Sequence, residues 1–191
     1  DSAGSSLHQL KELRKAVTSE TGFSKIDVLT DSGMAVDRIV LQAELSGVDL
    51  VIMGTKGASG LREALIGTIT ASVMEHANCP VVAVPQNATW KNFDRIVYAT
   101  SYEEGDFGNV EQLIKLAKSL DAEVILLHIS NGKYDRSFEF DAIERFCQRL
   151  AEETGFKRLS FKLLENDDIY EGLDRYVEEV KADMLAMTLR H

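Results

Sequence analysis

The sequence predicts an α/β protein built from open, doubly wound parallel sheets, and three observations lead to this fold class. Short apolar segments that are typical of buried strands alternate with longer amphipathic segments that are typical of helices. The tetrapeptide Glu-Thr-Gly-Phe occurs at residues 20–23 and again at 153–156, within the same apolar pattern. A cluster of glycines follows one of the apolar segments. Helices that alternate with short strands predict parallel strands joined by crossover connections.

The two copies of the tetrapeptide lie in the same order of predicted elements. The residues before it form a helical stripe in each copy: Leu10, Leu13 and Val17, and Ile143, Phe146 and Leu150. The residues after it alternate as in a half-buried strand: Ile26 and Val28, and Leu159 and Phe161. One inserted residue shifts the next helix, whose matching positions are Ile39, Ala43 and Ser46, and Leu173, Val177 and Val180. The strands at 49–53 and 183–187 then correspond, so the repeat predicts helix, strand, helix, strand in both copies.

The copies begin and end at different points of this unit. The first continues through a helix near 68–77 and a strand at 81–84, whereas the second starts earlier, with a strand at 95–100, a helix at 107–120 and a strand at 123–129. We therefore predict one domain at 1–85 that lacks its first two strands, and one at 93–191 that lacks its last helix and strand. Superposing the copies gives the order βαβαβαβαβ, with further residues expected before 1 and after 191. In an alternative that we rank second, residues 95–129 complete the sheet of the first domain, which would leave the rest of the second copy without a core.

The glycines follow the apolar strand at 50–53. Gly54-Thr55-Lys56-Gly57 comes directly after it, and Gly67-Thr68 precedes a helix with Ile69, Val73 and Ala77 on one face, for which Thr68 is a suitable cap. In open α/β sheets, ligands bind beyond the carboxyl ends of the strands, where a helix start offers free amides to an anion. Neither a Walker loop nor Gly-x-Gly-x-x-Gly occurs. The spacing of the glycines alone gives equal weight to a phosphate-binding loop and to glycines that serve only to form a turn.

Composition excludes several classes of function. The net charge of −10 argues against a sequence-independent nucleic-acid partner, because such proteins present a basic surface. No apolar run reaches the roughly 20 residues of a membrane span. The two cysteines, Cys79 and Cys147, lack the spacing of a zinc site. We therefore expect a cytoplasmic protein without membrane or nucleic-acid contacts.

The glycine spacing Gly54-x2-Gly57-x9-Gly67-Thr68 and its two flanking segments resemble the universal stress protein family in its tandem form. The segment before the glycines is Asp49-Leu50-Val51-Ile52-Met53, and the segment after them is Asn78-Cys79-Pro80-Val81-Val82-Ala83-Val84-Pro85. The resemblance implies ATP, with or without Mg²⁺, bound at the topological switch point of the sheet. By position it implies backbone approach to ribose and phosphates at Gly54, Lys56 and Gly57, and phosphate contacts at the helix start. The implied site residues are Met53, Gly54, Lys56, Gly57, Gly67, Thr68, Ile69 and Thr70. Core packing for Met53 and a solvated loop position for Lys56 are the alternatives.

The second copy departs from the family pattern. The family places an acidic residue after the first strand to contact adenine, and Ser101 stands there in the second copy. Thr188 stands where the first copy has Gly54. The corresponding strand of the first copy is not in this chain. We expect the second copy to be a structural partner of the first and not an ATP site.

The function predicted from the sequence is that of an ATP-binding regulatory module in the stress response, not an enzyme. His8, His76, His128 and His191 show no pattern with a nucleophile or a metal motif. A weak ATPase and a pairing module without a ligand are the alternatives. The apolar strand Val81–Val84 is expected to pair domains, either within one protein or in a homodimer.

Overall fold

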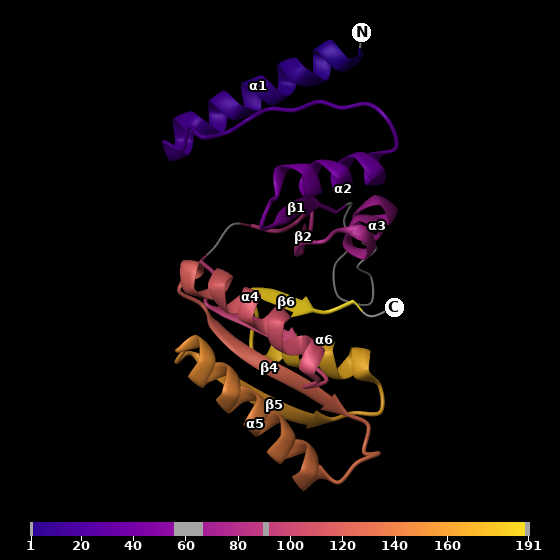
Figure 1. Cartoon of the computed structure of the whole chain (residues 1–191), viewed down its shortest axis with the longest axis vertical. Helices are drawn as coiled ribbons and strands as arrows, with labels where there is room; N and C mark the ends of the chain where they lie inside the picture. The colour runs from indigo at the N-terminus through magenta and orange to yellow at the C-terminus, as the bar shows by residue number, and fades with distance from the viewer. Residues whose placement is uncertain (1, 56–66, 90–91, 190–191) are drawn as a thin grey trace. The chain divides into compact units, whose positions relative to one another are not determined.

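The chain folds into two compact units in the computed structural model, which describes residues 2–55, 67–89 and 92–189 (Figure 1). Unit 1 contains the residues up to 54 together with residues 67–84. Unit 2 contains the described residues from 85 onward.

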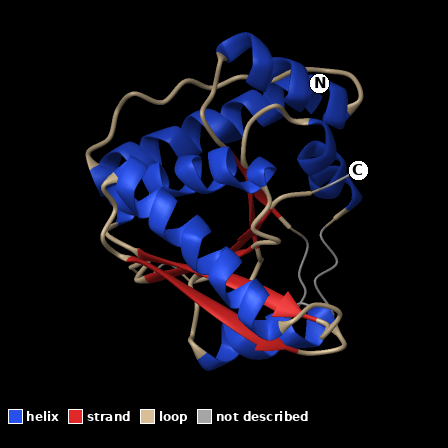
Figure 2. Cartoon of the chain, turned by 60° about the horizontal axis from the view of Figure 1, so that its bottom comes forward, coloured by secondary structure: helices blue, strands red, loops and turns tan. Residues whose placement is uncertain are grey.

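Unit 2 is built on a four-stranded parallel sheet. Its strands are β3 (Arg95–Ala99), β4 (Glu123–Ser130), β5 (Leu159–Glu165) and β6 (Met184–Met187), in the order β5-β4-β3-β6. Figure 2 draws the strands of the chain in red and its helices in blue. The central strand β3 aligns Val97 with Ile125 of β4 and with Leu185 of β6. The chain adds strands on one side of β3 and then returns to its other side. The topological switch point therefore lies between β3 and β6.

Three helices cover both faces of this sheet, α4 (Glu104–Leu120), α5 (Arg136–Thr154) and α6 (Ile169–Glu179). Alternate residues of β3 and β4 point to opposite faces, so the two strands contribute to two apolar cores. Ile96 and Leu126 pack with α4 and α5, and Val97 and Leu127 pack with α6. In the predicted stripe of α5, Phe146 and Leu150 belong to the first core and Ile143 is fully buried, as the periodicity indicates. Helices on both faces of a parallel sheet confirm the predicted fold class for unit 2.

Side-chain contacts at the helix starts and between helices fix the positions of α4, α5 and α6. Asp135 caps α5 by accepting from the amides of Ser137 and Phe138, and Asp168 caps α6 by accepting from the amide of Glu171.

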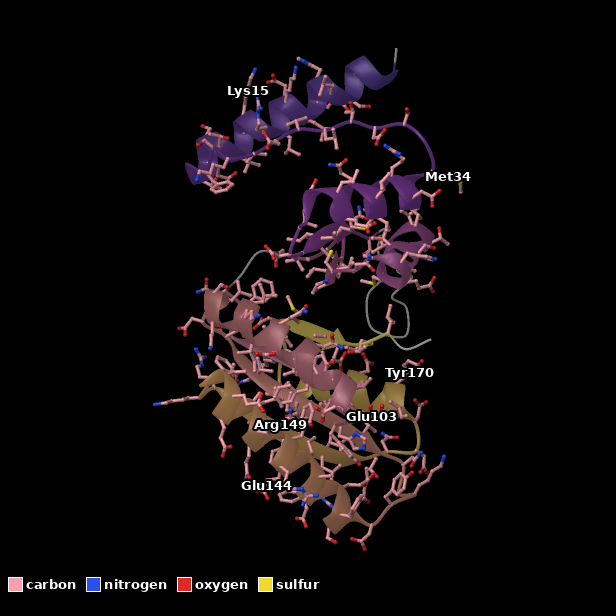
Figure 3. The ribbon with its side chains drawn as sticks, in the orientation of Figure 1. Lys15, Met34, Glu103, Glu144, Arg149 and Tyr170 are labelled. Atoms are coloured by element: carbon pink, nitrogen blue, oxygen red, sulfur yellow. The ribbon has the colours of Figure 1, made fainter. Side chains whose placement is uncertain are left out.

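Arg149 of α5, labelled in Figure 3, connects α5 to α4. It donates to both carboxylate oxygens of Glu104 at 3.0 and 3.1 Å. Its guanidinium carbon also lies 4.1 Å from the centroid of the Phe107 ring. Because the ion pair is exposed, we expect it to align the helices more than to stabilise them.

Unit 1 contains α1 (Ser2–Thr21), α2 (Ala35–Ser46), β1 (Val51–Gly54), α3 (Thr68–His76) and β2 (Val81–Val84). Its two strands are parallel, with Met53 opposite Ala83. Among the described residues of this unit, Thr70 and Val73 of α3 are the buried ones. The strands at 50–53 and 81–84 and the three helices are confirmed.

The strand predicted from Ile26 and Val28 is wrong, because the described residues 22–34 form no strand. In unit 2, the matching strand β5 is hydrogen-bonded along its length to β4. The described part of unit 1 contains no counterpart of β4. A strand conformation at 26–29 therefore has no backbone partner, and the alternating pattern alone does not stabilise it.

The expected burial of the α1 stripe is also wrong, since Leu10 is 37% exposed and Leu13 is 59% exposed. The helix itself forms, and it ends as α5 does. Thr21 donates its hydroxyl to the carbonyl of Val17 and accepts from the amide of Phe23, and Thr154 makes the equivalent bonds to Leu150 and Phe156. No helix in the described ranges combines the length and the apolar character that crossing a membrane requires.

Candidate functional site

The described residues of the predicted site gather where β1 ends and α3 begins. Met53 and Gly54 are the last residues of β1, and Gly67 occupies the N-cap position of α3. Thr68, Ile69 and Thr70 form the first helical turn, so the expectation that Thr68 is the cap is wrong. The predicted site residues Lys56 and Gly57 lie outside the described residues.

Thr70 joins the helix start to the strand end. Its hydroxyl lies 3.4 Å from the carbonyl oxygen of Gly54, and its side chain is buried. Val73 of the predicted helical face is buried, whereas Ile69 is largely exposed. Met53 is half-buried, as a residue at the border of a core would be. Strand end and helix start are thus held together by residues of the predicted site.

The glycines Gly54 and Gly67 are not explained by turn geometry or by packing. Neither has a positive φ, the conformation for which glycine is the usual residue, and Gly67 has φ −54° and ψ 144°. A Cβ atom built on either residue meets none of the described residues within 4 Å. Space is therefore open beside the backbone at both positions, which is the feature that a closely approaching ligand needs.

The first turn of α3 has the properties of an anion site. The first intrahelical hydrogen bond runs from the amide of Ala71 to the carbonyl of Gly67, at 3.0 Å. The amides of Thr68, Ile69 and Thr70 come earlier, so they have no acceptor within the helix. No side chain of the described residues caps this end, and the helix dipole adds partial positive charge. These amides can bind a phosphate or another anion.

The matching edge of unit 2 is filled by side chains. Thr188, which aligns with Gly54, lies 2.6 Å from the Tyr98 hydroxyl, and its own hydroxyl accepts from the Asn109 side-chain amide at 2.9 Å. These residues come from β3, α4 and the end of β6, so they span the switch point of unit 2. Sequence reasoning identified Thr188 as a departure but missed its two partners, which lie about 80 and 90 positions away in the chain.

Asp106 is the most buried carboxylate of unit 2, at 1% exposure. It accepts from the Thr100 hydroxyl at 2.8 Å and from the Ser101 amide at 3.1 Å. The carboxylate therefore binds the chain just after β3 to the first turn of α4. A signal for it exists in the sequence, because an acid in the first turn of a helix that follows a strand commonly binds the preceding loop.

His128 and Glu139 extend this polar cluster toward α5. His128 Nδ1 lies 2.8 Å from the Thr100 carbonyl oxygen, which can only accept, so Nδ1 carries the proton. Its Nε2 lies 3.7 Å from Glu139 Oε1. Glu139 is 2% exposed, although it opens an acidic run of the sequence at residues 139–153. Burial, followed by the Glu139 charge, raises the pKa of Tyr102, whose ring packs edge-on against His128.

We expect Asp106→Ala to lower the free energy of unfolding of unit 2 by about 2–4 kcal/mol, because the Thr100 hydroxyl and the Ser101 amide lose their shared acceptor inside the protein. Hydrogen exchange of β3 and β4 amides measures this in the intact chain. Asp141→Ala, at an exposed position of α5, is the control and should cost less than about 0.5 kcal/mol. Equal effects of the two variants would contradict the structural role of Asp106.

Comparison with protein-family models gives a match of residues 1–85 to the universal stress protein family. A universal stress protein of Methanocaldococcus jannaschii is 34% identical over 77 residues, which cover 40% of this chain and 46% of that relative. A second one from the same organism is 37% identical over 75 residues, covering 39% of this chain and 43% of the relative. The matched part thus spans less than half the length of either relative.

A solved structure of a universal stress protein from Archaeoglobus fulgidus superposes with a TM-score of 0.76. The alignment covers 93% of this chain and 64% of that chain, at 18% sequence identity. At this identity the likeness concerns the fold, and it confirms the universal stress protein architecture predicted from the sequence. Within the described ranges of the chain, no three His, Cys, Asp or Glu side chains are grouped as a metal site would require.

Proposed function

We propose that unit 1 binds ATP, with or without Mg²⁺, beyond the carboxyl end of β1, and that the protein acts as a regulatory module of the stress response. The observation that carries this proposal is the open space beside Gly54 and Gly67 at an uncapped helix start. The match of residues 1–85 to the universal stress protein family model supports it.

The residues of this site would contribute to ATP binding in different ways. The amides of Thr68, Ile69 and Thr70 would donate to phosphate oxygens, and the Thr68 hydroxyl would add a further donor. Gly54 and Gly67 would let the backbone approach the ligand, because neither carries a side chain. Lys56 and Gly57 would complete the loop. The negatively charged phosphates of ATP would accept hydrogen bonds from these donors. We assign contacts with the adenine base to no residue of this chain.

We propose a binding role without catalysis. The described residues around Gly54 and the start of α3 include no pair of carboxylates and no histidine with a nucleophile. The nearest histidine on α3, His76, has Nδ1 at 2.7 Å from the carbonyl of Ser72 at the far end of the helix. A weak ATPase is the alternative, and phosphate release at saturating ATP distinguishes the two.

Two measurements on the full chain test the proposal. Mass spectrometry of the denatured protein should detect copurified adenine nucleotide, and calorimetry of nucleotide-free protein should show ATP binding. Absence of both would overturn it and would leave the pairing module as the better function.

A second candidate role is pairing through β2, which lies at the end of the sheet order β1-β2 and is composed of Val81, Val82, Ala83 and Val84. We propose that it pairs with a second domain or with a second copy of the chain. If the partner is a second copy, Val82→Lys should shift sedimentation toward the monomer, and an unchanged association state would contradict pairing between copies. The free cysteines Cys79 and Cys147 agree with our proposal of a cytoplasmic location.

A further inference from the structure

Strand β5 forms one end of the sheet of unit 2, in the order β5-β4-β3-β6. Strand β4 pairs with it over residues 159–165, and no strand of the described chain pairs with its other edge. An open strand edge presents unpaired backbone amides and carbonyls, so it is a template for a further strand. The residues of β5 therefore decide what can pair with it.

The hydrogen bonds to β4 identify which residues of β5 direct their backbone to the open edge. The Arg158 carbonyl accepts from the Val124 amide at 2.9 Å, and the Asn166 amide donates to the Ser130 carbonyl at 3.0 Å. Successive residues of a strand direct their backbone groups to opposite sides, so the even-numbered residues of β5 face β4. The odd-numbered residues 159, 161 and 163 face the open edge.

The side chains on one face of β5 form a symmetric apolar pattern with opposite charges at its two ends. Alternate residues of a strand share a face. From just before the strand to its last residue, this face carries Lys157, Leu159, Phe161, Leu163 and Glu165. Such a pattern is complementary to itself when a second copy runs in the opposite direction.

An antiparallel second copy can place Phe161 opposite itself on a two-fold axis. Leu159 then lies opposite Leu163 of the second copy, and Lys157 lies opposite Glu165 of the second copy. Apolar pairs and opposite charges at directly facing positions stabilise antiparallel strands. The outward backbone groups of the three apolar residues also face one another, as the hydrogen-bonded pairs of an antiparallel ladder require.

Antiparallel registers centred on a neighbouring residue are less complementary. Centring on Lys162 would place two lysines directly opposite each other, and like charges at facing positions are destabilising. Centring on Ser160 would place Lys162 opposite Arg158. In the register centred on Phe161, Lys162 lies opposite Ser160 of the second copy. The charges of β5 therefore favour this register.

Phe140 of α5 supplies an independent observation at the same edge. Helix α5 runs alongside β5 (Figure 1), and the Phe140 ring packs edge-on against Phe161 with the ring centroids 5.1 Å apart. Phe140 is nevertheless 45% exposed. With Phe161 on the two-fold axis, a second copy would bring another such pair of rings beside this one. Aromatic clusters of this kind add to the stability of an interface.

The charge at this edge permits two copies to approach, although the chain carries a net charge of −10. Residues 157–165 contain three basic residues, Lys157, Arg158 and Lys162, and one acidic residue, Glu165. Arg158 forms an ion pair with Asp121 of the same chain at 2.9 Å. The acidic excess of the chain therefore lies elsewhere. An acidic peptide would fit the lysines but would oppose Glu165, whereas a second copy fits both.

We propose that the protein self-associates through β5, which pairs antiparallel with β5 of a second copy and joins the two sheets into one. The interface is two-fold symmetric, so each contact occurs twice. It combines main-chain hydrogen bonds with apolar pairs and with ion pairs between Lys157 and Glu165. It goes beyond nucleotide binding and depends neither on ATP nor on pairing through β2.

The first test measures hydrogen exchange of the full chain as its concentration rises from about 1 μM to about 1 mM. Exchange at the amides of Leu159, Phe161 and Leu163 should slow by at least about tenfold over this range. The amides of Ser160 and Lys162 face β4 in both states, so they are the internal reference. Unchanged exchange at the first three amides would overturn the proposal, and so would concentration-dependent protection confined to β2.

The second test reverses charges at the two ends of the interface. Lys157→Glu would place acidic side chains opposite each other, and it should weaken the association by at least about fivefold. Glu165→Lys should have a similar effect. The double variant restores opposite charges and should associate within about twofold of the unmodified chain. The concentration at which the Phe161 amide is half protected measures the association in each case.

Lys162→Glu is the matched control, because it changes the net charge as Lys157→Glu does but lies opposite Ser160 of the second copy. It should alter the association by less than about twofold. The mutated positions are exposed, as is the ion pair of Glu165 with Arg136 at 3.3 Å, so each variant should keep its fold. Exchange at β3 amides checks this. Equal weakening by the two glutamate variants, or no recovery in the double variant, would overturn the proposal.

Discussion

Gly67→Asp is expected to abolish ATP binding by unit 1 while leaving α3 at least as stable as before. The φ and ψ of Gly67 are those of an extended residue that any side chain can adopt, and aspartate is a favoured N-cap. Its carboxylate would occupy the amides of the first turn and would repel the phosphates. At about 4 Å and an effective dielectric constant of about 20, the repulsion is about 4 kcal/mol. We therefore expect calorimetry to show an affinity loss on the order of 100-fold or more.

Gly67→Asn is the control, because asparagine has the same shape and capping ability without the charge. It should weaken ATP binding far less than aspartate does. An aspartate variant that binds ATP as tightly as the original chain would exclude the start of α3 as the phosphate site. If both variants lose binding equally, the cause is the volume of the side chain and not its charge.

Ile143→Ala is expected to lower the free energy of unfolding of unit 2 by about 2–5 kcal/mol. The side chain is fully buried, so its removal leaves a cavity. Leu10→Ala deletes a side chain at the equivalent position of α1, where it is partly exposed. We expect that change to cost less than about 1 kcal/mol.

Hydrogen exchange at the amides of β4 measures the effect of Ile143→Ala on unit 2, and exchange at the amides of β1 measures the effect of Leu10→Ala on unit 1. Equal losses in both variants would contradict the difference in burial. A large loss for Leu10→Ala would mean that another surface covers the stripe of α1 in solution.

Much of the fold was predictable because the signals are local. The alternation of apolar strands with amphipathic helices identified the α/β class, and the repeated tetrapeptide aligned α1 with α5 and α2 with α6. The failure at Ile26 and Val28 has a simple cause. A helix satisfies its own backbone, whereas a strand requires a neighbour that the alternating pattern does not supply.

The candidate site was predictable in position but not in detail. Spacing identified Gly54 and the start of α3, yet it assigned the cap to Thr68 in place of Gly67. The contact between Thr70 and the Gly54 carbonyl joins residues 16 positions apart, which no local pattern indicates. The same holds for Glu139, whose burial beside His128 no local pattern indicates.

The sequence by itself determined the fold class, the order of the elements and the place where glycines meet a helix start, because periodicity, glycine and capping chemistry act over a few residues. Only the tertiary structure decided which apolar faces are covered. Phe146 and Leu13 have the same local pattern, but Phe146 packs in one core with residues of β3 and β4, whereas Leu13 is 59% exposed. The tertiary structure also decided that the glycines border open space, since the absence of neighbours depends on chain segments distant in sequence. Burial and open space are properties of long-range contacts, so a local pattern can predict the element but not what packs against it.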